Sequence, residues 1–100
     1  MEVRDNRDEE RYEASVDGDL AGFAVYRSRP GLIAFMHTEV DSAFKGEGVG
    51  STLVREALDD ARRRGLDVMP FCPFVNSYID RHRDYVDLVP ESRWETFGLS

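Results

Sequence analysis

Apolar and polar residues alternate along the first forty residues of the chain. In the segment YEASV, every second residue from Tyr12 to Val16 is apolar, which is the period of a β-strand with one buried face. The segments DGD and SRPG have the glycine and proline chemistry of tight turns, and LIAFMHTEV is apolar enough on both faces to lie centrally in a sheet. The pattern predicts a three-stranded antiparallel meander, with strands at 12–16, 20–27 and 32–40 and turns at 17–19 and 28–31.

The apolar period changes to that of a helix from Val49 onward. Apolar side chains recur on one stripe and charged side chains lie opposite them, until Gly65 and the three arginines before it mark a helix end. A short strand is predicted at 66–71 and a second, shorter helix at 74–85. Because a strand, a helix and another strand follow one another, the two strands are expected to be parallel.

The two ends of the chain show weaker patterns. The first ten residues are charged and nearly free of apolar side chains, so they are predicted to be a loose end. For residues 91–100 two alternatives stay open: a second loose end, or a tail that Trp94 and Phe97 pack onto the body. The 100 residues are expected to form one domain, because a second could not bury a core of its own. The predicted fold class is α/β, with a mixed sheet.

The charge balance narrows the classes of partner. The formal net charge is -7, and binding a phosphate backbone calls for a basic face, so nucleic acid is not expected as a partner. A cationic substrate is compatible with this charge. No apolar run has the length of a membrane span and the first residues are too polar for a signal peptide, so a cytoplasmic protein without membrane contact is expected. The single cysteine, Cys72, cannot form an intramolecular disulfide, and no metal site is predicted.

Three alternate glycines, Gly46, Gly48 and Gly50, stand at the start of the first predicted helix. The first N–H groups of a helix have no intrahelical partner, so a loop without side chains there favours an anion such as a pyrophosphate. The spacing is not that of a P-loop, and Ser51 stands where the dinucleotide fingerprint needs glycine. A flexible loop, or glycines that allow a helix to pack tightly, remain as alternatives.

The segment KGEGVG, which begins at Lys45, resembles the acetyl-CoA loop of the GCN5-related N-acetyltransferases. The signature of that loop is Gln or Arg, two residues, Gly, any residue, then Gly or Ala, and Lys45 keeps the positive charge of the first position. The segments HTEV, FKGEGVGSTLV, PFCPFV and YIDRHRDYVDLV resemble a very small branch of the family, so the resemblance spans residues 12–89. It implies a minimal N-acetyltransferase domain over 1–100, with acetyl-CoA as the acyl donor. The residues implied to bind the coenzyme are Val40, Lys45, Gly46, Glu47, Gly48, Val49, Gly50, Ser51 and Asn76.

The helices that larger family members have between their first two strands are missing, and the segment DGD turns directly instead. Those helices commonly help to build the acceptor site. The resemblance therefore implies acetyl-CoA more firmly than any particular acceptor.

His37 and Glu39 are the candidates for proton transfer. They lie two residues apart on a predicted strand and so share a face, where either could accept a proton from an incoming ammonium group. The resemblance favours Glu39, because a glutamate near this point of the sheet often has that role in the family. The alternative is a hydrogen-bonded structural histidine beside a surface charge.

Cys72 is the candidate nucleophile. It stands between Pro70 and Pro73 at the end of the last predicted strand, where it could accept the acetyl group and pass it on; a small buried hydrophobe is the alternative. Chain order is expected to bring Cys72, His37 and Glu39 together near the glycine loop.

Asn76 could be the N-cap of the second helix, a coenzyme contact, or both. The tyrosine that usually protonates the thiolate in this family does not map cleanly, because Tyr78 comes too early and Tyr85 slightly late. The general acid therefore stays open, with His82 and Tyr85 as weak candidates that are also explained by packing.

The predicted function is transfer of an acetyl group from acetyl-CoA to an amine, by direct attack or through Cys72. One alternative is an acyl-CoA-binding or sensing module without turnover, and another is an interaction domain in which the loop serves packing alone. The acceptor, a small-molecule or peptide amine, and the choice between monomer and homodimer stay open.

Overall fold

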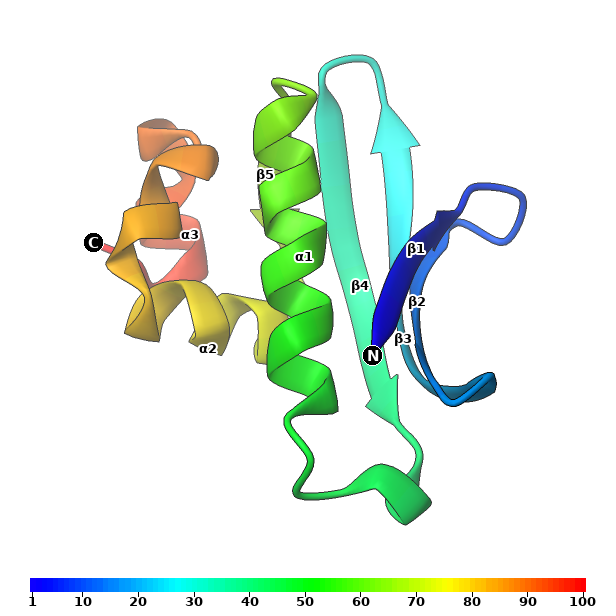
Figure 1. Ribbon diagram of the computed structural model, residues 1–100. Coiled ribbons are helices and arrows are strands. Elements are labelled where there is room, and N and C mark those ends of the chain that lie inside the picture. The colour runs from blue at the N-terminus through cyan, green and yellow to red at the C-terminus, as the bar shows by residue number, and fades with distance from the viewer.

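The computed structural model describes residues 1–100 as one five-stranded sheet with its helices on one side (Figure 1). The strands are β1 (Glu2–Asn6), β2 (Arg11–Val16), β3 (Asp19–Arg29), β4 (Leu32–Val40) and β5 (Asp67–Pro70). The α-helices are α1 (Val49–Arg63), α2 (Pro73–Arg81) and α3 (Trp94–Phe97), and the 3-10 turns are η1 (Ser42–Phe44), η2 (Arg83–Leu88) and η3 (Glu91–Arg93).

The order of strands in the sheet follows their order in the chain. β1 to β4 pair antiparallel, whereas β5 pairs with β4 in parallel after α1 has crossed the sheet. The predicted meander, the crossover and the mixed α/β sheet are therefore confirmed. The predicted second helix ends earlier than expected, at Arg81, and η2 takes over from residue 83.

The prediction that the first ten residues are a loose end is wrong. Residues 2–6 form β1, which pairs along its whole length with residues 11–15 of β2. One of the charges that suggested disorder is paired across the strands, because Arg4 Nη2 lies 3.4 Å from the carboxylate of Glu13. The neutral amide of Asn6 donates to the same carboxylate at 3.1 Å. Cross-strand pairs of opposite charge stabilise a sheet, so a charged segment forms an edge strand here.

The C-terminal tail is packed rather than loose. Leu99 is fully buried, and the Trp94 side chain donates a 2.8 Å hydrogen bond from Nε1 to the carbonyl of Val89. Phe97 packs edge-on against Phe71, with ring centroids 5.2 Å apart. Of the two alternatives for residues 91–100, the packed tail is confirmed.

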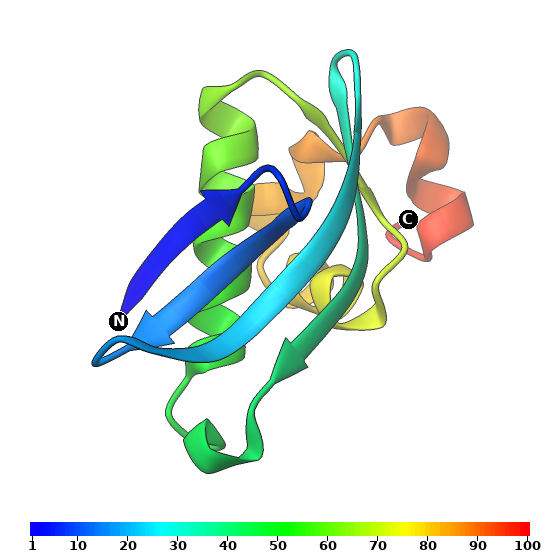
Figure 2. The ribbon, with the colours of Figure 1, turned by 90° about the vertical axis from the view of Figure 1, so that its right-hand side faces the viewer.

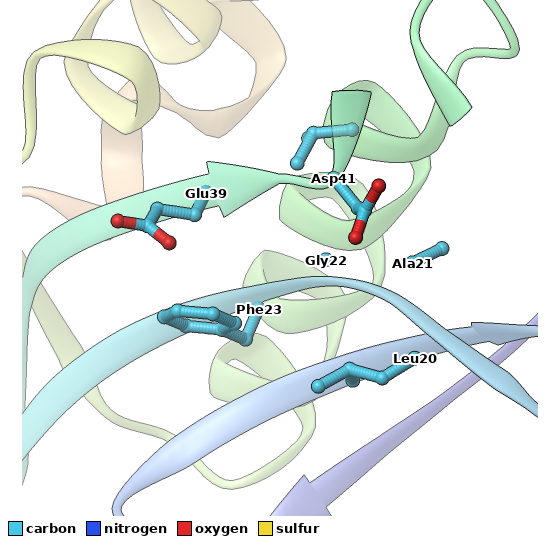
Figure 3. Close-up of a pocket in the computed structure, with 7 residues that line it drawn as sticks. Leu20, Ala21, Gly22, Phe23, Glu39 and Asp41 are labelled. Atoms are coloured by element: carbon cyan, nitrogen blue, oxygen red, sulfur yellow. The ribbon is translucent and has the colours of Figure 1, made fainter. Parts of the chain in front are cut away.

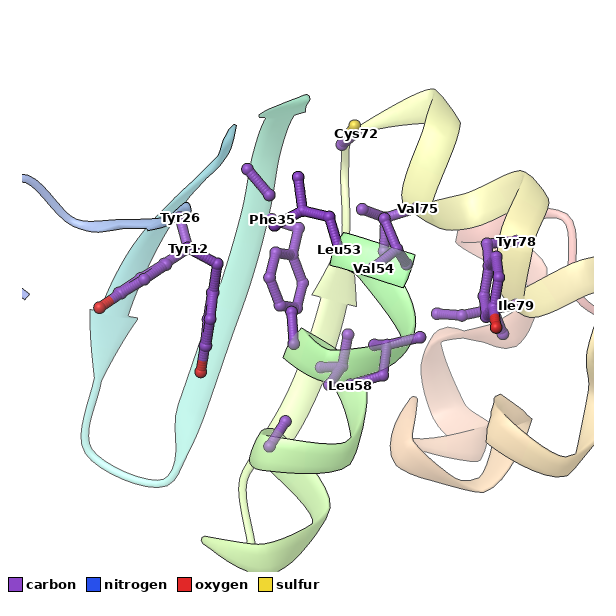
Figure 4. Packing of buried hydrophobic residues seen from close by; sticks show 14 of the residues in the cluster. Tyr12, Tyr26, Phe35, Leu53, Val54, Leu58, Cys72, Val75, Tyr78 and Ile79 are labelled. Carbon is purple, nitrogen blue, oxygen red and sulfur yellow. The ribbon is translucent and has the colours of Figure 1, made fainter. Parts of the chain in front are cut away.

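The core lies between the sheet and α1, and continues between α1 and α2. Figure 4 shows Leu53 and Leu58 of α1 against Phe35 of the sheet, with Ile79 of α2 beyond. All four of these side chains are at most 1% exposed, and full burial of such a side chain is worth about 1.5–3 kcal/mol. The opposite face of β1 to β4 carries no helix (Figure 2).

The first helix ends as its sequence predicts. Gly65 has a φ of +66°, its N–H donates to the carbonyl of Arg62, and the N–H of Leu66 donates to the carbonyl of Ala61. This glycine-dependent helix end reverses the chain directly into β5. None of the helices combines the length and apolar character needed to cross a lipid bilayer.

Two buried tyrosines tie the first three strands to α1. Tyr12 donates a 2.5 Å hydrogen bond from its hydroxyl to Asp60 of α1, and Tyr26 donates a 2.5 Å bond to Asp5 of β1. Arg64 lies 3.5 Å from Asp60 and 3.6 Å from Asp5, so it bridges the two carboxylates. Burial works to raise the pKa of Asp60, but the Tyr12 hydrogen bond and the charge of Arg64 outweigh it and hold that pKa below its usual range.

We expect Asp60→Asn to lower the free energy of unfolding at pH 7 by about 1–3 kcal/mol, because it weakens a partly buried hydrogen bond to a charged group. A lowered folded-state pKa stabilises the fold above the unfolded-state pKa, near 4, and this stabilisation is lost as the pH falls through the folded value. Urea unfolding between pH 7 and pH 3 should therefore show the gap between variant and wild type narrowing. Glu56→Gln, at an exposed position of the same helix, is the matched control, and a gap that does not change with pH would contradict the assignment.

Candidate active site

The pairing of β4 with β5 stops halfway along β4. The last paired residues are Phe35 and Pro70, and beyond them the N–H of Cys72 donates a 2.8 Å hydrogen bond to the carbonyl of Phe35. Pro70 and Pro73 can donate no backbone hydrogen bond. From residue 36 to Val40, β4 therefore has no neighbouring strand on its β5 side.

The backbone of this unpaired stretch is available for hydrogen bonding. The N–H of Asp41 donates to the carbonyl of Ala21 on β3, so Asp41 belongs to a hydrogen-bonded pair of the ladder. Hydrogen-bonded and non-hydrogen-bonded pairs alternate along antiparallel strands. Thr38 and Val40 therefore belong to non-hydrogen-bonded pairs with β3. Their N–H and C=O groups point away from β3, towards the side where β5 has ended.

A β-bulge decides which side chains of β4 face the helix-free side. The register with β3 shifts so that Met36 has no partner, and an extra residue reverses the alternation of side chains after it. Without the bulge, His37 and Glu39 would share the buried face of Phe35. Instead their side chains are 57% and 58% exposed, and Thr38 takes the inward direction.

His37 and Glu39 form a pair on the helix-free face of the sheet. His37 Nε2 lies 2.9 Å from Glu39 Oε1, so the expectation that the two side chains share a face is confirmed. A histidine held by a carboxylate at an exposed edge can accept a proton from a neighbouring group, directly or through water.

Cys72 lies on the other face of β4. Its side chain is 2% exposed and belongs to the hydrophobic core, and its only polar side-chain contact is Thr38, with Sγ and Oγ1 3.3 Å apart. The expected convergence of Cys72 with His37 and Glu39 is therefore wrong, because the bulge turns the latter two away. Cys72 is closer to the buried-hydrophobe alternative than to an exposed nucleophile.

The glycine loop leads from η1 to the start of α1. η1 is capped by Asp41, which accepts a 2.8 Å hydrogen bond from the N–H of Ala43. Gly46 and Gly48 have φ values of +83° and +76°, and a Cβ added at either would meet no atom within 4 Å. These two glycines are required by the left-handed backbone, and the space beside them is open.

The first turn of α1 presents unpaired N–H groups to this space. The first intrahelical bond is donated by Thr52 to the carbonyl of Gly48, no side chain caps the helix, and its first turn has no acidic residue. The N–H groups of Gly48, Val49, Gly50 and Ser51 thus donate to no acceptor of the chain. With the positive end of the helix dipole and the exposed Lys45 beside it, this is a favourable position for an anion, although Glu47 adds one exposed carboxylate.

Gly50 has a different role from the two glycines before it. A Cβ at Gly50 would lie 2.7 Å from Cζ of Phe74 and 3.3–3.4 Å from two further ring atoms. The ring of Phe74, on the first turn of α2, therefore packs directly on the backbone of α1. The tight-packing alternative holds at Gly50, and the anion-site interpretation fits Gly46 and Gly48.

Asn76 is not the N-cap of the second helix. Cys72 is the N-cap and Pro73 begins α2, so Asn76 lies inside the helix, where its Nδ2 donates a 2.9 Å hydrogen bond to the carbonyl of Phe97. The proline takes the first helical position because its fixed φ suits it. A role of Asn76 in holding the coenzyme stays a prediction.

The candidates for the general acid all have structural partners. Burial, followed by a 2.7 Å hydrogen bond donated to Asp59, raises the pKa of Tyr85 to about 12, and burial also raises the pKa of Tyr78. The ring of His82 stacks on Tyr78 with centroids 4.0 Å apart. His82 and Tyr85 thus have the packing role that the sequence left as an alternative, and Tyr78, which comes too early in the chain for the family's tyrosine, is packed against both.

Two residues at the site were missed by the sequence reasoning. Thr38 and Phe74 line the region between the end of β5 and the start of α1, through the contacts with Cys72 and Gly50 described above. Nothing in the sequence marks the threonine between His37 and Glu39 as a site residue, and for Phe74 the sequence predicts only a place in the second helix. No group of three or more His, Cys, Asp or Glu side chains is arranged to hold a metal ion.

Comparison with protein families and curated proteins gives two matches. A family model described as GCN5-related N-acetyl-transferase matches residues 11–88. Streptothricin acetyltransferase from Streptomyces lavendulae is 43% identical over 51 residues, which cover 49% of this chain and 27% of that protein. The chain thus spans only about a quarter of the length of this curated relative.

Solved structures share the fold. A GCN5-like protein from Staphylococcus aureus superposes with a TM-score of 0.67 at 22% identity, covering 89% of this chain and 87% of that chain. Ribosomal-protein-alanine N-acetyltransferase from Brucella melitensis biovar Abortus 2308 superposes with a TM-score of 0.54 at 25% identity, covering 80% and 61% of the two chains.

The contact between Gly50 and Phe74 can be tested by a double-mutant cycle. We expect Gly50→Ala to lower the free energy of unfolding in the wild type, because the new Cβ displaces the Phe74 ring. In a Phe74→Ala background the same change should raise it by up to about 1 kcal/mol, because alanine is the better helix former. Urea denaturation of the four proteins gives the cycle, and an effect of Gly50→Ala with the same sign in both backgrounds would show that the contact is not limiting.

Proposed function

The chain belongs to the family of GCN5-related N-acetyltransferases, and we propose from this premise that it transfers an acetyl group from acetyl-CoA to an amine. The observation that supports this most directly is the run of unpaired N–H groups at the start of α1, next to an open space without side chains. Such a position suits the pyrophosphate of the coenzyme.

The unpaired half of β4 supplies the second part of the coenzyme site. The pantetheine arm of coenzyme A contains amide groups, and the outward N–H and C=O groups of Thr38 and Val40 are suitable partners for them. Lys45 adds a positive charge at the loop. In this proposal the remaining coenzyme-binding residues are Gly46, Glu47, Gly48, Val49, Gly50, Ser51 and Asn76.

Direct attack by the acceptor amine is the route that the side-chain positions favour. Acetyl-CoA supplies an acyl group already activated as a thioester. The neutral amine nitrogen forms the new C–N bond while the C–S bond breaks, and CoA leaves as its thiolate with the electron pair of that bond. The proton that the nitrogen loses passes to His37, which Glu39 holds. Since Cys72 is buried in the core, transfer through its thiol is the less favoured route.

The names of the relatives agree on the reaction but differ in the acceptor. One acts on streptothricin and another on an alanine of a ribosomal protein, according to their names. What they share is acetylation. We therefore propose an amine as the acceptor on the basis of the family, and address its chemistry separately below.

The coenzyme site is tested by Gly48→Val. We expect this variant to bind acetyl-CoA at least about tenfold more weakly, because a branched side chain at a left-handed position obstructs the N–H groups and strains the loop. Gly31→Val is the matched control, since Gly31 has a φ of +73° and equally open surroundings in the β3–β4 turn. Calorimetric titration of both variants measures the affinity, and equal affinities would remove the argument from the loop.

The route of transfer is tested by Cys72→Ser together with mass spectrometry after mixing with acetyl-CoA. We expect a coenzyme-sized adduct on the native protein, no acetyl increment on the denatured protein, and turnover by the variant within about threefold of wild type. An acetyl increment at Cys72, with loss of turnover in the variant, would establish the covalent route instead. If the protein binds the coenzyme but releases no CoA in the presence of any amine tested, a binding module without turnover is favoured.

A further inference from the structure

A small pocket lies on the helix-free face of the sheet, between the start of β3 and the end of β4 (Figure 3). Its volume is about 120 Å³. Leu20 and Phe23 line it from β3, and Glu39 of β4 and Asp41, the residue that follows β4, line it from the other side. Figure 3 shows α1 behind the two strands at this point. The pocket is thus on the side where the proposed acceptor would approach.

Glu39 links this pocket to the proposed reaction site. One of its carboxylate oxygens, Oε1, is 2.9 Å from His37 Nε2, and the residue is also one of those that line the pocket. His37 lies two residues back along β4, towards the point where β5 ends. A molecule reaching from the pocket to His37 therefore runs along β4.

The lining of the pocket favours a positive charge. Glu39 and Asp41 are its only charged members, and it contains no Lys or Arg. Each carboxylate has only one oxygen engaged, Glu39 by His37 and Asp41 by the N–H of Ala43. The Arg11 guanidinium, which lies 4.6 Å from the centroid of the Phe23 ring, is already paired with Glu13 at 2.7 Å.

The chemistry of the pocket indicates that it does not hold the amine that reacts. Two carboxylates stabilise an ammonium group in its charged form, and a charged ammonium is not a nucleophile. The volume is below the roughly 300 Å³ at which pockets for whole small molecules begin. The apolar walls formed by Leu20 and Phe23 suit methylene groups.

We propose that the acceptor carries two ammonium groups on one flexible aliphatic scaffold, and that this pocket holds the one that is not acetylated. The reacting amine lies at His37, and the second ammonium lies between Glu39 and Asp41. A free linear diamine and a pair of lysine side chains both have this chemistry. The proposal rests on the proposed acetyltransferase function and adds the class of acceptor.

The test compares acceptors of equal length and different charge. Release of CoA is measured with 1,5-diaminopentane against pentylamine, and with a blocked Gly-Lys-Lys-Gly peptide against blocked Gly-Lys-Gly. We expect kcat/KM to be about fivefold higher for the doubly charged member of at least one pair, mainly through KM and less so at high salt. The pair that shows the preference identifies the source of the second charge.

Asp41→Asn tests the pocket itself. Asparagine can still accept the hydrogen bond from Ala43 and cap η1, so the variant removes the charge and keeps the turn. We expect it to reduce the kcat/KM preference for the doubly charged acceptor by at least about half. Asp19→Asn, at an exposed position outside the pocket, should leave this preference unchanged.

The failures of the two proposals are distinguishable. A preference below about twofold in both pairs, or an undiminished preference in Asp41→Asn, would overturn the pocket assignment while acetyl transfer stands. If acetyl-CoA binds by calorimetry but no amine releases CoA, the acetyltransferase function is overturned and the acceptor class with it.

Discussion

The early end of the pairing between β4 and β5 is the constraint on which the site depends. Two prolines flank Cys72 and cannot donate to a ladder, and the N–H of Cys72 takes the last carbonyl of β4 that β5 could reach. The chain must then leave the sheet, and it does so by starting α2 at Pro73. The consequence is an edge of β4 with free backbone groups inside an otherwise continuous fold.

The packing of α1 fixes the anion site relative to that edge. One stripe of α1 is buried against the sheet, and Phe74 presses on the backbone of Gly50 at the first turn. Since Phe74 follows Cys72 by two residues, the short segment from Cys72 to Phe74 both bonds to Phe35, where the pairing of β4 ends, and packs on the start of α1. The positions of the unpaired N–H groups and of the open strand edge are therefore coupled through a single aromatic ring.

Periodicity and turn chemistry were sufficient to predict most of the fold, because the apolar face of each strand of the meander and of α1 can be recognised from the residues of that segment alone. β1 was missed since its polar side chains find partners that are distant in the sequence: Arg4 and Asn6 both donate to Glu13 of β2. The opposite placement of Cys72 and His37 was missed for another reason: it follows from one bulged residue, Met36. A bulge depends on how two strands pair, so the alternation of apolar and polar residues along one strand does not reveal it.

The uncovered face of the sheet has a direct bearing on how the proposed acceptor would be recognised. In this chain residues 7–10 turn directly from β1 to β2, its first two strands, where the larger members that the chain resembles have helices. The expectation that the segment DGD stands in the place of those helices is therefore wrong, because DGD joins β2 to β3. No helix therefore builds a wall over β3 and β4 (Figure 2). Side chains that rise from the strands themselves must provide the selectivity, and on β4 the bulge brings His37 and Glu39 into that position. The same backbone irregularity thus separates the buried cysteine from the acceptor side and supplies that side with its polar groups.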